Sequence, residues 1–186
     1  ETAVSCCLES IQNHSDGLHR VLFLAALYQP SRVIDSRYDA IRDCLTVNLI
    51  AAMQISRCVL PILLQQGYGQ LALCASVAGQ FGLPGGQPYS ASKAGLINLA
   101  ESLRAETPAD IDIKLINPGF VKTRLTDKNS FKMPCLISAE VAAQHIISGL
   151  QSHRFEIHFP KRFTYFTKLL AMLPYPLSLW LSKQCT

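Results

Sequence analysis

The sequence predicts an α/β fold built on an open parallel sheet, and three features of the chain support this prediction. Short runs of apolar residues, typical of strands buried on both faces of a parallel sheet, recur along the chain. Long segments with helical spacing of apolar residues separate these runs. Strand-like and helix-like segments alternate from about residue 20 onward, which is the order that parallel α/β sheets require.

The first clear strand is the apolar run Arg20–Ala26, after a less readable start in which Cys7, Leu8 and Ile11 have the spacing of a short helix. A loop over Gln29–Asp35 is expected to lead into a long helix over Tyr38–Leu64. The stripe of that helix comprises Ile41, Leu45, Leu49, Ala52, Ile55 and Val59. Pro61 lacks a backbone N–H, so we expect it to kink or shorten the helix.

The later elements follow the same alternation. Glycines 67 and 69 mark a turn before a buried strand, and a glycine- and proline-rich loop over Gly79–Pro88 precedes a helix. That helix is expected over Tyr89–Glu106, with Pro108 closing it, and Ser138 is expected to cap another helix over residues 139–150. Three further runs predict strands: Leu71–Ala75, Ile111–Ile116 and Phe155–Phe159.

Composition narrows the class of protein. The chain has 186 residues, enough for one domain, and 49% of them are hydrophobic, so we expect a large core. The net charge of +4 is mild and no basic run is present, which argues against nucleic-acid binding. Neither the seven cysteines nor the five histidines have metal-ligand spacing, so no metal site is expected. Reduced, buried thiols in a cytoplasmic protein are the simplest interpretation.

Ser76, Tyr89 and Lys93 form the most informative motif. Tyr89 and Lys93 lie four residues apart at the start of a predicted helix, so they share a face, and Ser76 ends a predicted strand. An ammonium group close to a tyrosine can lower the pKa of the phenol, and a serine can hold the reacting oxygen. Each residue alone would be an ordinary surface or capping residue, but together they predict a proton-transfer site.

These residues resemble the short-chain dehydrogenase/reductase family, in which a serine stands thirteen positions before a Tyr-x-x-x-Lys motif, as Ser76 does here. Asn48 in TVNLIAA matches the asparagine of the family, and Pro118-Gly119 with Val121 and Thr123 matches its Pro-Gly-x-x-x-Thr segment. The resemblance covers about Val21 to Phe159. It implies a Rossmann-like doubly wound parallel sheet, present here as a single partial domain over residues 1–186 that lacks the first strands and the glycine-rich turn.

The resemblance also implies roles for these residues and an NAD(P)-dependent oxidoreductase acting on a carbonyl or secondary alcohol. Tyr89 would be the acid/base, Lys93 would bind the nicotinamide ribose, Ser76 would orient the substrate, and Asn48 would hold a water linked to Lys93. The catalytic set is therefore Asn48, Ser76, Tyr89 and Lys93. The expected cofactor is NADP or NAD, bound by Tyr89, Lys93, Pro118, Gly119, Val121 and Thr123.

Two departures from the family pattern keep a second hypothesis open. No glycine-rich turn is found near the N-terminus, and Leu27 stands where the family has a glycine. Leu27 is expected either to crowd the nicotinamide ribose or to send its loop along another course. The alternative function is a non-catalytic or incomplete relative that binds no dinucleotide.

Three expectations concern the surroundings of the site. The loop Leu125–Ile137 would form a lid that, with Phe81 and Leu83, makes an apolar pocket for a hydrophobic carbonyl substrate. The helices Tyr38–Leu64 and Tyr89–Glu106 resemble those through which family members pair, so a homodimer or homotetramer is expected. The apolar tail over about 160–186 is expected to pack on the domain or on a partner subunit, the alternative being peripheral attachment to a membrane surface.

Overall fold

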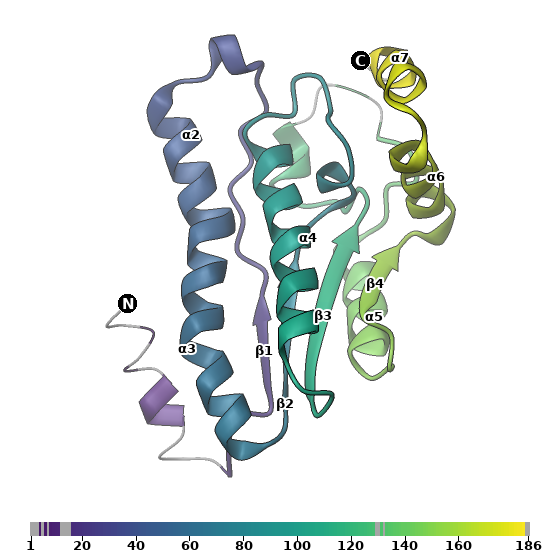
Figure 1. Cartoon of the computed structure of the whole chain (residues 1–186). Coiled ribbons are helices and arrows are strands. Elements are labelled where there is room, and N and C mark those ends of the chain that lie inside the picture. The colour runs from purple at the N-terminus through teal and green to yellow at the C-terminus, as the bar shows by residue number, and fades with distance from the viewer. Residues whose placement is uncertain are drawn as a thin grey trace.

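A parallel four-stranded sheet forms the centre of the computed structural model, which describes residues 4, 6, 8–11, 16–128, 131 and 133–184. The strands are β1 (Arg20–Phe23), β2 (Gly69–Cys74), β3 (Ile111–Pro118) and β4 (Glu156–Phe159). They lie in the order β1-β2-β3-β4, and each neighbouring pair is parallel (Figure 1). The α/β fold with a parallel sheet is therefore confirmed.

Helices connect the strands in the predicted order. Residues 38–66 form one continuous helix, made of α2 (Tyr38–Leu45), a π-helical turn (Thr46–Ile50) and α3 (Ala51–Gln66). It is followed by α4 (Tyr89–Glu106), α5 (Ala139–Leu150), α6 (Lys161–Met172) and α7 (Tyr175–Gln184). Ser138 caps α5 as predicted, because its side chain accepts a hydrogen bond from the backbone N–H of Val141 at 3.3 Å.

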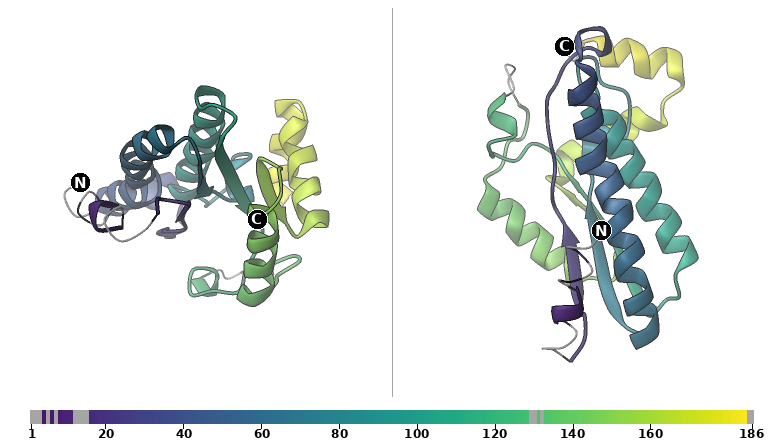
Figure 2. Two further views of the ribbon diagram at one scale, coloured as in Figure 1. Left: turned by 90° about the horizontal axis from the view of Figure 1, so that it is seen from below. Right: turned by 90° about the vertical axis from the view of Figure 1, so that its left-hand side faces the viewer.

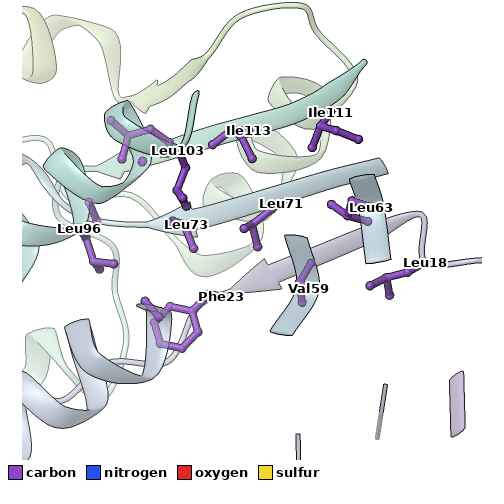
Figure 3. Packing of buried hydrophobic residues seen from close by; sticks show 14 of the residues in the cluster. Leu18, Phe23, Val59, Leu63, Leu71, Leu73, Leu96, Leu103, Ile111 and Ile113 are labelled. Carbon is purple, nitrogen blue, oxygen red and sulfur yellow. The ribbon is translucent and has the colours of Figure 1, made fainter. Parts of the chain in front are cut away.

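The two faces of the sheet are covered by different helices, as in a doubly wound fold (Figure 2). Helices α3 and α4 pack on one face, where Leu71 and Leu73 of β2 meet residues such as Val59, Leu63, Leu96 and Leu103 (Figure 3). Helix α5 packs on the other face, where Ala72 of the same strand belongs to a second cluster with Ala142 and Ile157. Alternate residues of β2 thus enter opposite cores.

The first strand is shorter and more exposed than the sequence suggested. We expected a strand over Arg20–Ala26 buried on both faces, but β1 ends at Phe23 and only Phe23 is buried. The prediction was wrong because β1 is an edge strand in the described residues, paired only with β2, and its Leu22 side chain remains 37% exposed. Residues 24–30 form an extended segment after it.

The long helix is not shortened at Pro61, which was one of the two effects expected of this proline. Pro61 lies inside α3 and is exposed, and the helix continues to Gln66 before Gly67 ends it with a left-handed conformation at φ 75°. By length and composition alone, Tyr38–Gln66 is also the one helix of the described residues that could cross a membrane, with a mean hydropathy of 1.7. This is weak evidence, since helices that pack on a sheet pass the same test.

The predicted short N-terminal helix is present, because Val4, Cys6 and Leu8–Ile11 are helical, whereas Cys7 lies outside the described residues. The cysteines are less uniformly buried than we expected. Cys44 is buried, but Cys6 and Cys135 are exposed, since they lie in the N-terminal helix and in the loop before α5. Cys185 also lies outside the described residues.

Candidate active site

Ser76, Tyr89 and Lys93 meet at the carboxyl end of β2. Ser76 follows β2 directly, and Tyr89 is the first residue of α4, so Lys93 lies one helical turn further on. The Ser76 side chain is hydrogen-bonded to the side chain of Tyr89 and also accepts from the backbone N–H of Ala78 at 3.1 Å. The Lys93 Nζ lies 5.6 Å from the centroid of the Tyr89 ring. The structure therefore brings the predicted motif together.

Lys93 is almost fully buried, with 1% of its surface exposed, and its ammonium group donates a hydrogen bond to the Cys74 carbonyl oxygen at 2.7 Å. The long side chain thus crosses from α4 to the end of β2. An ammonium group has three N–H donors, and this bond uses one of them. The donor set fits a ligand with neighbouring hydroxyl groups, such as the ribose of a nicotinamide cofactor.

Asn48 anchors the segment after β1. Its side chain is fully buried in the π-helical turn, where it accepts from the Leu27 N–H at 2.7 Å and donates to the Leu27 carbonyl oxygen at 3.0 Å. The same amide nitrogen donates to the Ser92 hydroxyl at 2.9 Å. Protein groups bond both ends of the Asn48 amide, so its side chain fixes the backbone of Leu27 against α4. That Asn48 also holds a water linked to Lys93 stays a prediction.

Tyr28 is a site residue that the sequence analysis missed. Its ring meets the Tyr89 ring edge-on, with centroids 4.8 Å apart and an interplanar angle of 77°. Its backbone carbonyl accepts a hydrogen bond from the Lys128 ammonium at 2.9 Å, which ties the loop after β3 to the segment after β1. The position of Tyr28 shortly after a parallel strand was the available signal, because the carboxyl ends of such strands converge.

The pKa values at the site do not follow the prediction that Lys93 would lower the pKa of Tyr89. Burial raises the pKa of Tyr89 above its ordinary value of 10.0, with a smaller opposing effect from the Ser76 hydrogen bond. Burial likewise lowers the pKa of Lys93. Desolvation dominates both groups, because each loses the water that would stabilise its charge. Tyr89 therefore carries its proton near neutral pH.

The buried lysine predicts a specific dependence of stability on pH. Because the pKa of Lys93 is lower in the folded state, the unfolded chain binds more protons between that value and 10.5, and the free energy of unfolding rises with pH in this window. Lys93→Met removes this rise. Urea unfolding from about pH 7 to about pH 9.5 should show the difference between wild type and variant shifting in favour of wild type. A constant difference would contradict the account.

Gly79 allows the backbone of the turn after β2 to pack closely against the backbone of α4. A Cβ atom at this position would lie 2.6 Å from the Lys93 carbonyl carbon and 2.7 Å from the Ala94 nitrogen, both backbone atoms that cannot move aside. The contact sets the distance between the turn that follows Ser76 and the helix that carries Tyr89 and Lys93. The sequence analysis placed this glycine only in a glycine- and proline-rich loop.

Gly79→Ala should therefore destabilise the protein by about 1–3 kcal/mol, through overpacking. Gly82→Ala is the matched control, since a Cβ there meets no atom within 4 Å and the change should be nearly neutral. Thermal unfolding of the two variants measures the difference. Equal melting temperatures would show that the close approach of Gly79 to α4 does not matter.

The predicted cofactor segment lies at the carboxyl end of β3, next to Ser76. Pro118 ends β3, and the Gly119 N–H donates to the Phe159 carbonyl oxygen at 2.7 Å. The space that Gly119 leaves is filled by Phe163 of α6, because an added Cβ would lie 2.8 Å from its ring. Val121 forms a β-bridge with Ile137, and the N–H of the exposed Thr123 donates to the Thr126 hydroxyl.

Other predicted features are only partly placed by the structure. In the expected lid, Phe131 is 52% exposed and contacts Phe120 with ring centroids 5.8 Å apart, while Lys132 lies outside the described residues. A surface hollow between the loop at Gly82–Gln87 and α7 is lined by Leu83, but not by Ser76, Tyr89 or Lys93. In the part of the chain that the structure describes, no group of three His, Cys, Asp or Glu residues could hold a metal.

The family model described as short chain dehydrogenase matches residues 1–133, and the chain belongs to this family. A curated relative from Myxococcus xanthus, named an uncharacterized oxidoreductase, is 30% identical over 171 residues, covering 91% of this chain and 68% of the relative. Carbonyl reductase family member 4 of Xenopus laevis is 28% identical over 127 residues, which cover 68% of this chain and 54% of that protein.

Solved structures share the fold at lower identity. A short-chain dehydrogenase from Burkholderia cenocepacia in complex with NADP has a TM-score of 0.82 and 21% identity, covering 96% of this chain and 73% of that one. One from Sphingobium yanoikuyae in complex with NADPH has a TM-score of 0.76 and 20% identity, over 86% and 62% of the two chains. The chain thus spans about half to three quarters of the length of these proteins.

Proposed function

We propose that the protein is an NAD(P)-dependent oxidoreductase that moves a hydride between the nicotinamide cofactor and a carbonyl or secondary alcohol. The observation that carries the proposal is the contact of Ser76 with Tyr89, beside the buried Lys93, at the carboxyl end of a parallel sheet. Membership of the short-chain dehydrogenase family and the NADP and NADPH complexes of similar folds support the cofactor assignment.

In this proposal the cofactor supplies the hydride and the protein supplies the proton and the orientation. The Tyr89 hydroxyl, protonated near neutral pH, donates its proton to the carbonyl oxygen of the substrate, and Ser76 holds that oxygen by a hydrogen bond. Lys93 directs its remaining donors to the ribose. Asn48 supports the reaction by holding Leu27, next to Tyr28, at the rim of the site.

We also assign the segment after β3 to the cofactor side of the site, with Pro118, Gly119, Val121 and Thr123 as candidate contacts. The support is their position, because the carboxyl ends of neighbouring parallel strands meet at one edge and β3 pairs with β2 up to Ile116. The Phe163 ring at Gly119 places an aromatic wall beside this segment. An apolar substrate fits this environment, since Phe120 also contacts Phe163 with ring centroids 5.5 Å apart.

Calorimetric titration with NADPH and with NADH tests the proposal. Saturable binding of at least one of them at micromolar concentration is expected, and Tyr89→Phe should bind it with similar affinity because it keeps the ring. No binding of either cofactor would contradict the proposal. It would favour a non-catalytic relative instead, a second candidate suggested by the bulky Leu27 beside the site.

The substrate class is tested by a panel of carbonyl compounds. Apolar ketones and aldehydes should be reduced with higher kcat/KM than small charged ones, because desolvating a charge beside Phe120 and Phe163 is costly. A preference for charged substrates would contradict the assignment.

Pairing of subunits through α3 and α4 is part of the same proposal. Ile50, Met53 and Leu64 on the helix 38–66 are 45–47% exposed, and Ala91 and Ala94 on α4 are exposed small residues that allow close approach. Light scattering at micromolar concentration should show a dimer or tetramer, and a monomer alone would contradict the pairing.

A further inference from the structure

Helix α6 is amphipathic, but its apolar face points away from the domain. It buries Thr164, Thr167 and Leu170 against the domain. Its large apolar side chains face outward, and Tyr165, Phe166, Leu169 and Met172 are 53–82% exposed. A helix that only covered a core would bury these residues and expose its threonines. The outer face of α6 therefore has the character of a binding surface.

Helix α7 extends this apolar character. Tyr175, Leu177, Leu179 and Trp180 are 46–81% exposed, while the buried Ser182 donates a hydrogen bond to the Gly82 carbonyl oxygen at 2.9 Å. We call these four residues and the four exposed residues of α6 the tail surface. In Figure 1 both helices lie at the outer edge of the molecule beyond β4.

The net positive charge of the chain comes from the same segment. Residues 157–186 contain four basic residues, Lys161, Arg162, Lys168 and Lys183, and no Asp or Glu. The rest of the chain has 13 basic and 13 acidic residues, so the whole net charge of +4 belongs to the tail. Lys168 forms an ion pair with Glu156 of β4, whereas Lys161 and Arg162 are exposed at the start of α6.

We propose that α6 and α7 dock the protein onto an anionic membrane surface. Exposed aromatic and aliphatic side chains beside lysine and arginine are what an interfacial helix needs, because the apolar groups enter the acyl boundary and the cations meet lipid phosphates. The helices have 12 and 10 residues, about 18 and 15 Å of helix, and cannot span a hydrocarbon core of about 30 Å. They lie on the surface.

A second copy of this chain is a poorer occupant. A contact of the tail surface with itself would bring together two segments that each carry four basic residues and no Asp or Glu to neutralise them. Anionic lipid headgroups supply the missing negative charge. Charge complementarity therefore favours the membrane surface.

Docking would also orient the candidate active site. Phe163 on α6 contacts Gly119, and Ser182 on α7 contacts the loop that leads into Tyr89. If the proposed oxidoreductase activity holds, a membrane-bound tail places the mouth of the site near a source of lipid-like carbonyl compounds. The docking itself does not depend on that activity, and binding to vesicles is measured without cofactor or substrate.

Trp180 provides the readout, because it is the only tryptophan of the chain and belongs to the tail surface. The full chain is mixed with vesicles of phosphatidylcholine, or of phosphatidylcholine and phosphatidylglycerol, and both sedimentation and Trp180 fluorescence are followed. Sedimentation with the anionic vesicles and a blue shift of the emission are expected, with weaker binding to the neutral vesicles and at high salt.

Three variants make the test specific. Lys161→Gln with Arg162→Gln should weaken binding about fivefold for each charge, roughly 25-fold together. Phe166→Ser with Leu169→Ser should abolish it while the circular dichroism spectrum stays unchanged. Val33→Ser with Ile34→Ser, two residues 64% and 81% exposed outside the tail, should bind as wild type does.

Three results would overturn the proposal. One is no sedimentation with the anionic vesicles. Another is equal binding to both kinds of vesicle. The third is a blue shift that grows with protein concentration in the absence of lipid, together with a larger species in light scattering, which would show that a second copy covers the tail surface.

Discussion

Replacing Tyr89 with phenylalanine should lower kcat for carbonyl reduction by about 100-fold to 10,000-fold, the usual contribution of a positioned proton donor. The substitution keeps the ring, so the edge-on contact with Tyr28 and the burial of the site remain. Only the hydroxyl that bonds to Ser76 is lost. The measurement is the steady-state rate of NADPH or NADH oxidation with a carbonyl substrate.

Tyr38→Phe is the matched control, because Tyr38 is 77% exposed at the start of α2 and should not affect turnover. Tyr89→Phe should also keep its melting temperature within a few degrees of wild type. If it retains wild-type turnover, Tyr89 does not supply the proton.

Asn48→Ala should cause the largest loss of stability among the polar substitutions at the site. The change removes the side chain that bonds Leu27 N–H and Leu27 carbonyl, as well as the donor to Ser92. Leaving buried polar groups without partners costs about 1–3 kcal/mol each, and partial rehydration of Leu27 reduces the sum to about 2–4 kcal/mol. The melting temperature should fall by roughly 5–15 °C.

Asn98→Ala on α4 makes the same chemical change at an exposed helical position and should be neutral or slightly stabilising, since alanine favours helix more than asparagine. Calorimetric or circular dichroism melting compares the two. A similar melting temperature for both variants would show that the hydrogen bonds between Asn48 and Leu27 contribute little to the stability of the protein.

The sequence was sufficient to predict the sheet, the helices and the meeting of Ser76, Tyr89 and Lys93. The spacing of residues along the chain specifies these features directly. Residues four apart in a helix, such as Tyr89 and Lys93, share one face, and a continuous apolar run such as that of β2 has to be buried in a core. The boundaries of α4 and α5 followed from their proline and serine signals.

Features that depend on tertiary contacts could not be predicted. The exposure of β1 depends on which strands pair with it, and the amide of Asn48 meets the backbone of Leu27, 21 residues away. The pKa shifts of Tyr89 and Lys93 depend on how deeply both are buried, which spacing along a helix does not reveal. Gly79 acts through a contact with α4 that no local pattern indicates, and the contact of Tyr28 with Tyr89 was signalled only by the position of Tyr28 after a parallel strand.

The most direct test of the central claim is the transfer of deuterium from a nicotinamide cofactor deuterated at the carbon that carries the hydride. Wild-type protein is incubated with this cofactor and an apolar ketone or aldehyde, and the product is examined by mass spectrometry. The account predicts one deuterium on the carbinol carbon. A reduced product without deuterium, or no reduction of any compound in the panel, would contradict it.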